Sequence, residues 1–88
     1  MKTKEGYMLR QIAGKWVVIP FGERVVEFNS IITLNDTGAK IWKGLEKGES
    51  KDVILEDLLA EFNADKHTAS MDFDEFVNLL RTNGLLES

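Results

Sequence analysis

Residues 32–42 divide the sequence into two halves of different character. Residues 32–34 have the alternating, β-branched pattern that is typical of a strand end. Asn35 or Asp36 then offers a side-chain oxygen to the unpaired N–H groups of a helix start. Beyond this cap, four residues recur at the spacing of one helix face: Gly38, Ile41, Trp42 and Leu45. The chain is therefore predicted to change from strands to helices at this joint.

Gly38 lies near the start of that helix face, although glycine weakens a helix by about 1 kcal/mol relative to alanine. A glycine in this position is expected where another backbone approaches closely. The joint itself contains no arrangement of residues that could carry out chemistry.

The first half of the chain is predicted to begin with a β-hairpin. Residues 7–13 and 16–20 form its two strands, with the turn at Gly14. Because residues 16–19 have no polar face, the second strand is predicted to be central or covered on both sides. Pro20 cannot donate to a strand ladder and ends this strand.

A second hairpin is predicted from residues 24–28 and 31–34, around Asn29 and Ser30. Asparagine tolerates the positive φ that such a turn often needs. Residues 1–6 are polar and charged, and we expect them to fray.

The second half is predicted to form three helices, over residues 36–45, 51–62 and from about 66 to 83. Ser50 caps the second helix, and Gly84 ends the third in a left-handed conformation. The second helix buries a stripe with Ile54 at its margin: Leu55, Leu58, Leu59 and Phe62. The third helix buries another: Ala69, Phe73, Phe76, Val77 and Leu80.

This order predicts an α+β fold in one domain over residues 1–88, with strands in 1–35 and helices in 36–88. N-terminal antiparallel β-hairpins would pack on a C-terminal three-helix bundle. The outline is that of a winged helix-turn-helix whose strands have moved to the front. A chain of 88 residues buries one modest core, which leaves no room for a deep cleft between lobes.

Composition excludes several classes of protein. The sequence has no cysteine, so disulfides, zinc knuckles and thiol chemistry are excluded. Its longest apolar run is four residues, too short for a membrane span or a signal peptide. We therefore expect a soluble cytoplasmic protein.

Catalysis by this chain is not expected. His67 is the single histidine, and a lone histidine near a helix start is most often a surface residue. Asp72, Asp74 and Glu75 cluster on the third helix, but paired carboxylates act as acid and base only when burial raises one pKa. No phosphate-binding loop and no metal-ligand pattern is present, so no cofactor and no metal are expected.

Charge argues against nucleic acid as the partner. Residues 1–35 hold five Lys and Arg against three Asp and Glu, whereas residues 36–88 hold six against twelve. The third helix, in the position of a recognition helix, offers mainly acids where a DNA groove requires basic and amide side chains. An acidic helical half repels phosphates but suits a basic peptide.

Peptide binding is the function that the residues leave open. A small sheet with an exposed edge can accept an extended peptide as an additional strand. Leu79 lies outside the main apolar stripe of the third helix, on the flank of Asp72. It is either a singly exposed leucine, which is common, or one wall of a peptide groove with acids beside it for a basic residue of the ligand.

Residues 34–42, Leu-Asn-Asp-Thr-Gly-Ala-Lys-Ile-Trp, resemble a characteristic segment of the pyrroloquinoline quinone (PQQ) biosynthesis protein D family. The resemblance spans nearly the whole chain, because further segments occur in family order: residues 12–14, 17–20, 28–30, 76–80 and 84–86. Residues 34–39 are its distinctive part. Residues 24–28 depart from the family pattern, since they look like an additional strand.

The resemblance implies a non-catalytic adaptor that binds the leader of a ribosomally made precursor peptide. The adaptor would present the precursor to a modifying enzyme, commonly a radical S-adenosylmethionine (SAM) enzyme, in the synthesis of PQQ or another peptide-derived product. The leader is implied to add as a strand beside the last sheet strand, against the third helix. On this sequence the peptide-binding residues would be Ile31, Ile32, Thr33, Leu34, Asp72, Glu75 and Leu79.

Two other functions remain as alternatives: a winged-helix nucleic-acid-binding regulator and a small structural subunit of a larger complex. An exposed sheet edge could also pair with itself in a homodimer.

Overall fold

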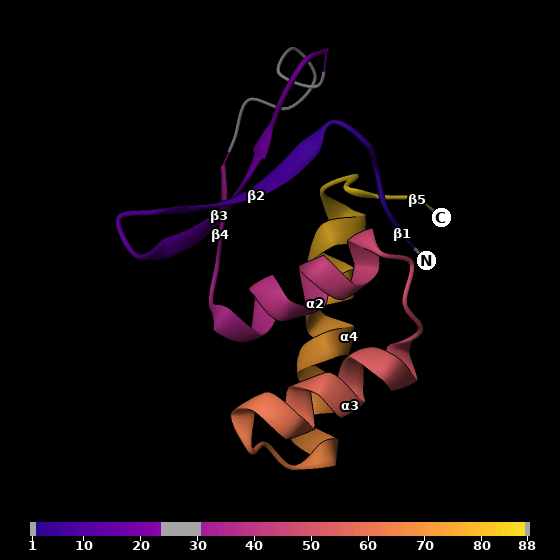
Figure 1. The fold of residues 1–88 in the computed structure, drawn as a ribbon. Coiled ribbons are helices and arrows are strands. Elements are labelled where there is room, and N and C mark those ends of the chain that lie inside the picture. Colours follow the sequence, from indigo (N-terminus) through magenta and orange to yellow (C-terminus); the bar gives the residue numbers. More distant parts are fainter. Residues whose placement is uncertain (1, 24–30, 88) are drawn as a thin grey trace.

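A computed structural model describes residues 2–23 and 31–87 of the chain. Antiparallel strands from the first half lie over helices from the second half, which confirms the predicted α+β class (Figure 1). The described residues form one three-stranded sheet, three helices and a separate two-stranded sheet that joins the two ends of the chain.

The three-stranded sheet has the order β2-β3-β4, and both of its strand pairs are antiparallel. Its strands are β2 (Tyr7–Ile12), β3 (Lys15–Pro20) and β4 (Ile32–Leu34). Ala13 and Gly14 make the hairpin turn with positive φ angles of 52° and 80°. The prediction that β3 is central is therefore confirmed. The second predicted hairpin involves residues 24–28 and a turn at residues 29–30, and both segments lie outside the described residues.

The helices begin and end close to where the sequence predicts. They are α2 (Asp36–Glu46), α3 (Lys51–Phe62) and α4 (Lys66–Thr82). Each start is capped by a side-chain oxygen, from Asn35, Ser50 and Asp65 in turn. Capping is decided by residues within one turn, and for this reason local sequence predicts these boundaries well.

The cap of α4 makes stability depend on pH. The N–H of Thr68 donates to Asp65 over 2.9 Å and its hydroxyl over 2.7 Å, and these bonds hold the pKa of Asp65 below its ordinary value. A lowered pKa in the folded state stabilises the fold above the unfolded-state pKa, and this contribution disappears as pH falls through the folded-state pKa. In urea unfolding, we expect Asp65→Asn to be less stable than the parent at pH 7. That difference should vanish in strong acid, and a difference that grows on acidification would contradict this account.

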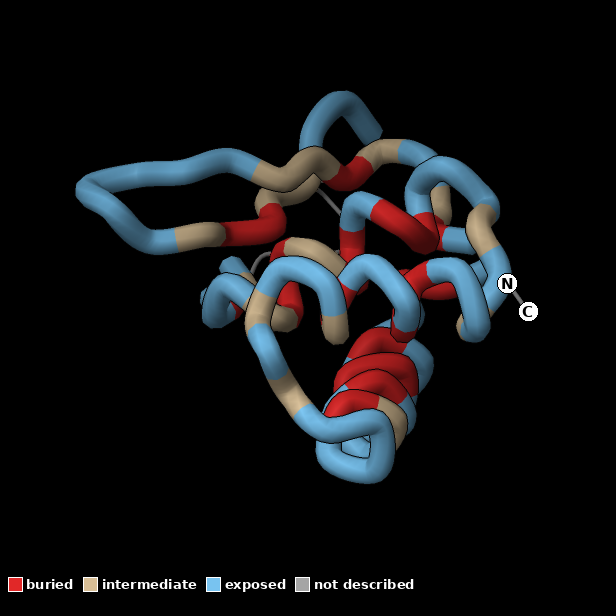
Figure 2. Tube along the Cα trace, turned by 60° about the horizontal axis from the view of Figure 1, so that its bottom comes forward, coloured by how far each residue is buried: buried red, intermediate tan, exposed pale blue. Residues whose placement is uncertain are grey.

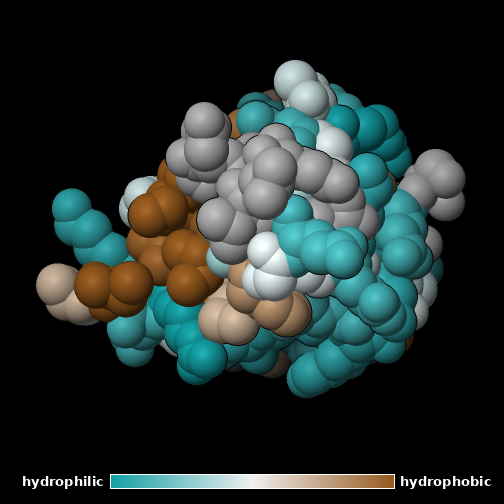
Figure 3. Space-filling view, turned by 90° about the horizontal axis from the view of Figure 1, so that it is seen from above, coloured by the Kyte–Doolittle hydropathy of each residue, from teal (hydrophilic) through white to brown (hydrophobic). Residues whose placement is uncertain are grey.

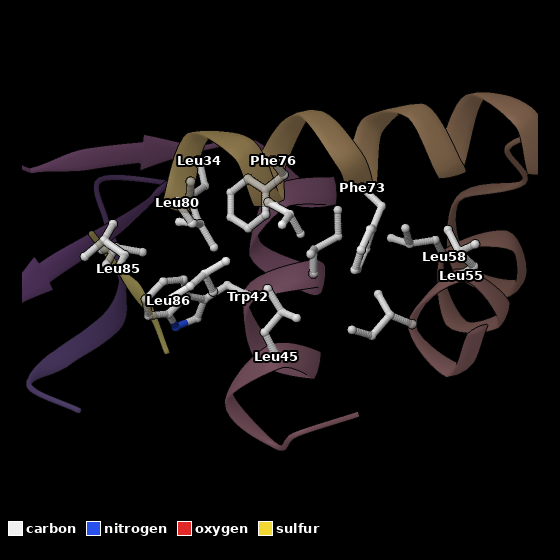
Figure 4. Packing of buried hydrophobic residues seen from close by; sticks show 14 of the residues in the cluster. Leu34, Trp42, Leu45, Leu55, Leu58, Phe73, Phe76, Leu80, Leu85 and Leu86 are labelled. Carbon is white, nitrogen blue, oxygen red and sulfur yellow. The ribbon is translucent and has the colours of Figure 1, made fainter. Parts of the chain in front are cut away.

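The core lies between the helices and the inner face of the sheet. Figure 4 shows Trp42 and Leu45 of α2 facing Phe73 and Phe76 of α4, and Figure 2 shows one buried stripe along a helix. The predicted stripe of α4 is buried in full: Ala69, Phe73, Phe76, Val77 and Leu80. In α3 the stripe is rotated from the prediction, because Ile54 is fully buried whereas Leu59 and Phe62 are only partly buried.

The expectation that the start of the chain frays is wrong for the described residues 2–6, while residue 1 lies outside the described residues. Lys2–Thr3 forms strand β1, which pairs antiparallel with β5 (Leu86–Glu87) from the other end of the chain. The Lys4 N–H also donates to the Leu85 carbonyl over 2.9 Å. Thr3 is 6% exposed, which is unusual for a residue so close to a chain end. A polar start looks mobile in sequence because its partner strand lies more than eighty residues away.

Two glycines of α2 are explained by side chains rather than by an approaching backbone. A Cβ added at Gly38 would lie 3.3 Å from both Asn35 Oδ1 and Phe76 Cε1. At Gly44, a Cβ would lie 2.6 Å from Ile54 Cγ1 and 2.9 Å from its Cδ1. Of these two glycines, Gly44 has less space, and it allows α2 to approach Ile54 of α3. The prediction from the sequence concerned Gly38 and not Gly44.

Gly44→Ala should lower the free energy of unfolding by about 1–3 kcal/mol, even though alanine is the better helix former. The added methyl group has no space beside the buried Ile54 side chain. Urea unfolding measures the loss. In an Ile54→Ala background the same change should be neutral or stabilising, because the methyl group then fills vacated space. An equal loss in both backgrounds would show that Ile54 is not the cause.

Candidate functional site

A groove of about 350 Å³ lies between the first turn of α2 and the side of α4. Its lining is contributed by both helices: Asn35, Thr37, Gly38, Ile41, Asp72, Glu75, Phe76 and Leu79. The floor is apolar, since Ile41 and Phe76 are buried. Its rim carries exposed polar and acidic side chains. The groove is therefore shaped to receive a side chain with an apolar body.

Helical spacing explains how α4 presents this groove. Asp72, Glu75, Phe76 and Leu79 recur at i, i+3, i+4 and i+7, and so they form one stripe along the helix. This groove stripe runs beside the core stripe, and Phe76 contributes to both. Leu79 is 44% exposed. The structure thus brings together the three α4 residues predicted for the site.

The opposite wall depends on the cap of α2. Asn35 Oδ1 accepts a hydrogen bond from the Gly38 N–H over 2.8 Å, which fixes the first turn of the helix. The missing side chain at Gly38 leaves space for the Phe76 ring. Asn35 and Thr37 then complete the polar rim. Sequence reasoning treated Asn35 as a cap only and did not include Thr37, although their place directly after the predicted docking strand was an available signal.

The four predicted strand residues lead into the groove but do not line it. Ile31 is 63% exposed, Ile32 is half-buried, Thr33 is exposed and Leu34 is buried. Within residues 2–23 and 31–87, β4 pairs with one strand only, β3. Because Leu34 is followed directly by Asn35, β4 leads into the groove wall.

The charge in the groove is negative. Asp72 and Glu75 are exposed, and the structure records neither a hydrogen bond nor an ion pair for them among the described residues. Asp74 differs, because it points to α3 and forms a salt bridge with Lys51 over 3.0 Å. No Lys, Arg or His lines the groove in the part of the chain that is described. The two groove acids are thus available to an incoming cation.

A known protein family matches most of this chain. The family model described as coenzyme PQQ synthesis protein D (PqqD) matches residues 15–86. The chain belongs to the PqqD family. The match covers β3, β4 and all three described helices, but not β2.

Two solved structures share the fold of this PqqD-family chain. One is described as TbiB1 in complex with the TbiA(beta) leader peptide; it has a TM-score of 0.80 and 25% identity, and the similarity covers 100% of this chain and 96% of that chain. The other is lasso peptide synthetase B1 complexed with the leader peptide, with a TM-score of 0.78, 23% identity, and 99% and 96% covered. A comparison with curated proteins found no match.

Two other surfaces of this PqqD-family chain differ from the groove in their lining. A larger hollow, of about 680 Å³, lies near β1 and residues 21–23, and charges of both signs line it. Figure 3 shows apolar side chains gathered at one side of the upper surface, the side toward which the β2–β3 hairpin projects in Figure 1. Exposed Ile12 ends β2, and exposed Ile31 directly precedes β4.

Metal-binding side chains do not come together in the described structure. His67 is exposed at the start of α4 and does not line the groove. Among the described residues, no three His, Cys, Asp or Glu side chains are placed to hold a metal ion. In the same residues, no helix combines the length and the apolar character that crossing a membrane requires.

Proposed function

We propose that this chain is a non-catalytic adaptor that binds the leader of a ribosomally made precursor peptide and presents the precursor to a modifying enzyme. The observation that carries the proposal is the groove next to β4, a strand that among the described residues is paired on one side only, in a chain of the PqqD family. The fold similarity to TbiB1, whose structure holds a leader peptide, supports it.

In this proposal the leader lies along β4 as an additional strand. Its main chain pairs with the open side of Ile31, Ile32, Thr33 and Leu34, and alternate side chains enter the groove. Asp72, Glu75 and Leu79 of α4 face it from one side, while Asn35 and Thr37 face it from the other. Main-chain pairing supplies affinity with little sequence dependence, and the groove supplies selection.

The finer points of the proposal follow from the family. The single domain over residues 1–88 acts in the cytoplasm, and the modifying enzyme is of the radical SAM type. The product is PQQ or another peptide-derived compound. Pairing of two copies through a sheet edge, as a homodimer, is compatible with the open side of β4 only while no leader occupies it.

Affinity capture tests the adaptor role directly. The tagged chain is purified from cells of its source, and mass spectrometry identifies both short peptides and large proteins that come with it. A short peptide captured together with a peptide-modifying enzyme is the expected result. A large partner without any peptide would favour the structural-subunit alternative and would count against leader binding.

We expect Thr33→Pro to weaken binding by up to roughly tenfold. The ligand in this test is a synthetic copy of the peptide identified by affinity capture. Proline removes one N–H from β4 and disturbs the strand on which the leader pairs, and one hydrogen bond is worth about 0.5–1.5 kcal/mol. Fluorescence anisotropy of a labelled peptide measures the affinity. Thr33→Val is the matched control, because it keeps the N–H and the branched shape. If neither fold nor affinity changed in Thr33→Pro, β4 would not be the docking edge.

A further inference from the structure

We infer that the groove selects a leader that carries a basic residue and an apolar residue two positions apart, on the same side of the bound strand. This inference rests on the proposed function and adds the chemistry of the peptide that the groove prefers. It depends on three properties of the site: the charge of its rim, the apolar floor, and the spacing of residues along α4.

The charge of the rim selects the basic residue. Asp72 and Glu75 lie on one stripe of α4, and the structure gives them no cationic partner within residues 2–23 and 31–87. The other described acids that form ion pairs are elsewhere, with Asp74 bound to Lys51 and Glu61 bound to Lys40. A lysine or arginine of the ligand would therefore meet two unneutralised carboxylates at the edge of a concave, partly apolar surface.

The floor suits the stem of such a residue. Phe76 lines the groove and is 9% exposed, so a small part of it is open to a ligand, whereas Ile41 borders the groove without exposed surface. Lysine and arginine pack their aliphatic stems on apolar surface while their charged ends stay at the rim. A short acidic or amide side chain would fit neither the floor nor the charge. The groove thus favours a long basic side chain over other polar ones.

The spacing along α4 selects the apolar residue. Leu79 is four residues from Glu75, which corresponds to a rise of about 6 Å along the helix. Two residues of a β-strand rise about 6.6 Å and point to the same face. A strand whose basic side chain reaches Glu75 therefore places a side chain on Leu79 two positions away. Leu79, at 44% exposure, has the free surface to receive an apolar one.

The order of the two residues reports the direction of the bound strand. In Figure 1, β4 runs down to the start of α2, whereas α4 rises from its first residue toward β5. A leader antiparallel to β4 would run the same way as α4 and would meet Glu75 before Leu79. Its sequence would read basic–x–apolar, and a parallel leader would read apolar–x–basic. Either order satisfies the inference, since the pairing of the two residue types is what it states.

Selection from a displayed library of random twelve-residue peptides tests this inference. Peptides retained by the purified chain should be enriched several-fold in Lys or Arg two positions from an aliphatic or aromatic residue. A double variant, Asp72→Lys with Glu75→Lys, should retain peptides with Asp or Glu in place of the basic residue. The control, Asp52→Lys with Glu56→Lys, makes the same change of charge on exposed positions of α3 and should keep the original preference.

The outcomes separate the inference from the proposed function. Retained peptides without a basic residue, or an unchanged preference after reversal of the groove charge, would overturn the inference and leave peptide binding intact. Failure of the parent chain to retain any peptide above background would overturn both. A basic preference lost equally in both double variants would also overturn it, because the effect would then come from net charge and not from the groove.

Discussion

Trp42→Ala should lower the free energy of unfolding by about 3–5 kcal/mol, the largest stability loss that we expect from a single substitution. Trp42 has no exposed surface and lies in the middle of the core, on the helix that also forms one wall of the groove. Small domains are stable by only about 5–15 kcal/mol, so this loss would leave a substantial unfolded fraction at moderate urea concentration. Urea unfolding followed by circular dichroism measures it.

Trp42→Phe is the matched control. The indole Nε1 of Trp42 is buried and has no hydrogen-bond partner in the described structure. Phenylalanine removes this unsatisfied donor and keeps most of the ring contacts, so the loss from the smaller volume is partly offset. We expect Trp42→Phe to be clearly more stable than Trp42→Ala. Equal losses would show that the larger volume of the indole, and not the aromatic contacts that phenylalanine keeps, provides the contribution of this residue.

The parts of the fold that sequence predicted well are those decided within a few residues. The caps at Ser50 and Asp65, the left-handed stop at Gly84 and the core stripe of α4 all follow from local chemistry or from helical spacing. The central position of β3 also followed from its own residues, because a strand without a polar face must be covered.

The parts that sequence missed depend on contacts between distant residues. β1 is a strand only because β5 and the buried Leu85 lie beside it, and nothing within residues 1–6 indicates this. The rotation of the α3 stripe toward Ile54 has a similar cause. Gly44 allows α2 to approach on that side, and the spacing within α3 alone could not show which of its apolar residues would meet α2.

The candidate site shows the same division. Asp72, Glu75 and Leu79 could be placed on one face from helical spacing, and they do share one groove. The facing wall of Asn35 and Thr37 could not be found in this way, because it exists only where the start of α2 meets α4. The roles of Ile31, Ile32, Thr33 and Leu34 in pairing with a peptide stay predictions; within residues 2–23 and 31–87, β4 has a partner strand on one side only.

Leu79→Asp should weaken binding of the captured leader peptide by roughly 10- to 100-fold while the free energy of unfolding changes by no more than about 0.5 kcal/mol. The leucine side chain is exposed at the groove, so the fold does not depend on it, but an apolar ligand side chain would lose its contact surface. Anisotropy titration gives the affinity and urea unfolding gives the stability.

Val53→Asp is the matched control, because Val53 is 43% exposed, against 44% for Leu79, and it does not line the groove. It lies in the first turn of α3, where an aspartate interacts favourably with the helix dipole. The two variants therefore add the same charge and remove similar apolar surface, and they differ mainly in location. We expect Val53→Asp to bind the leader normally. If Leu79→Asp instead unfolded the chain, Leu79 would be a core residue. If both variants weakened binding equally, added negative charge would be the cause, and the leader would not contact Leu79.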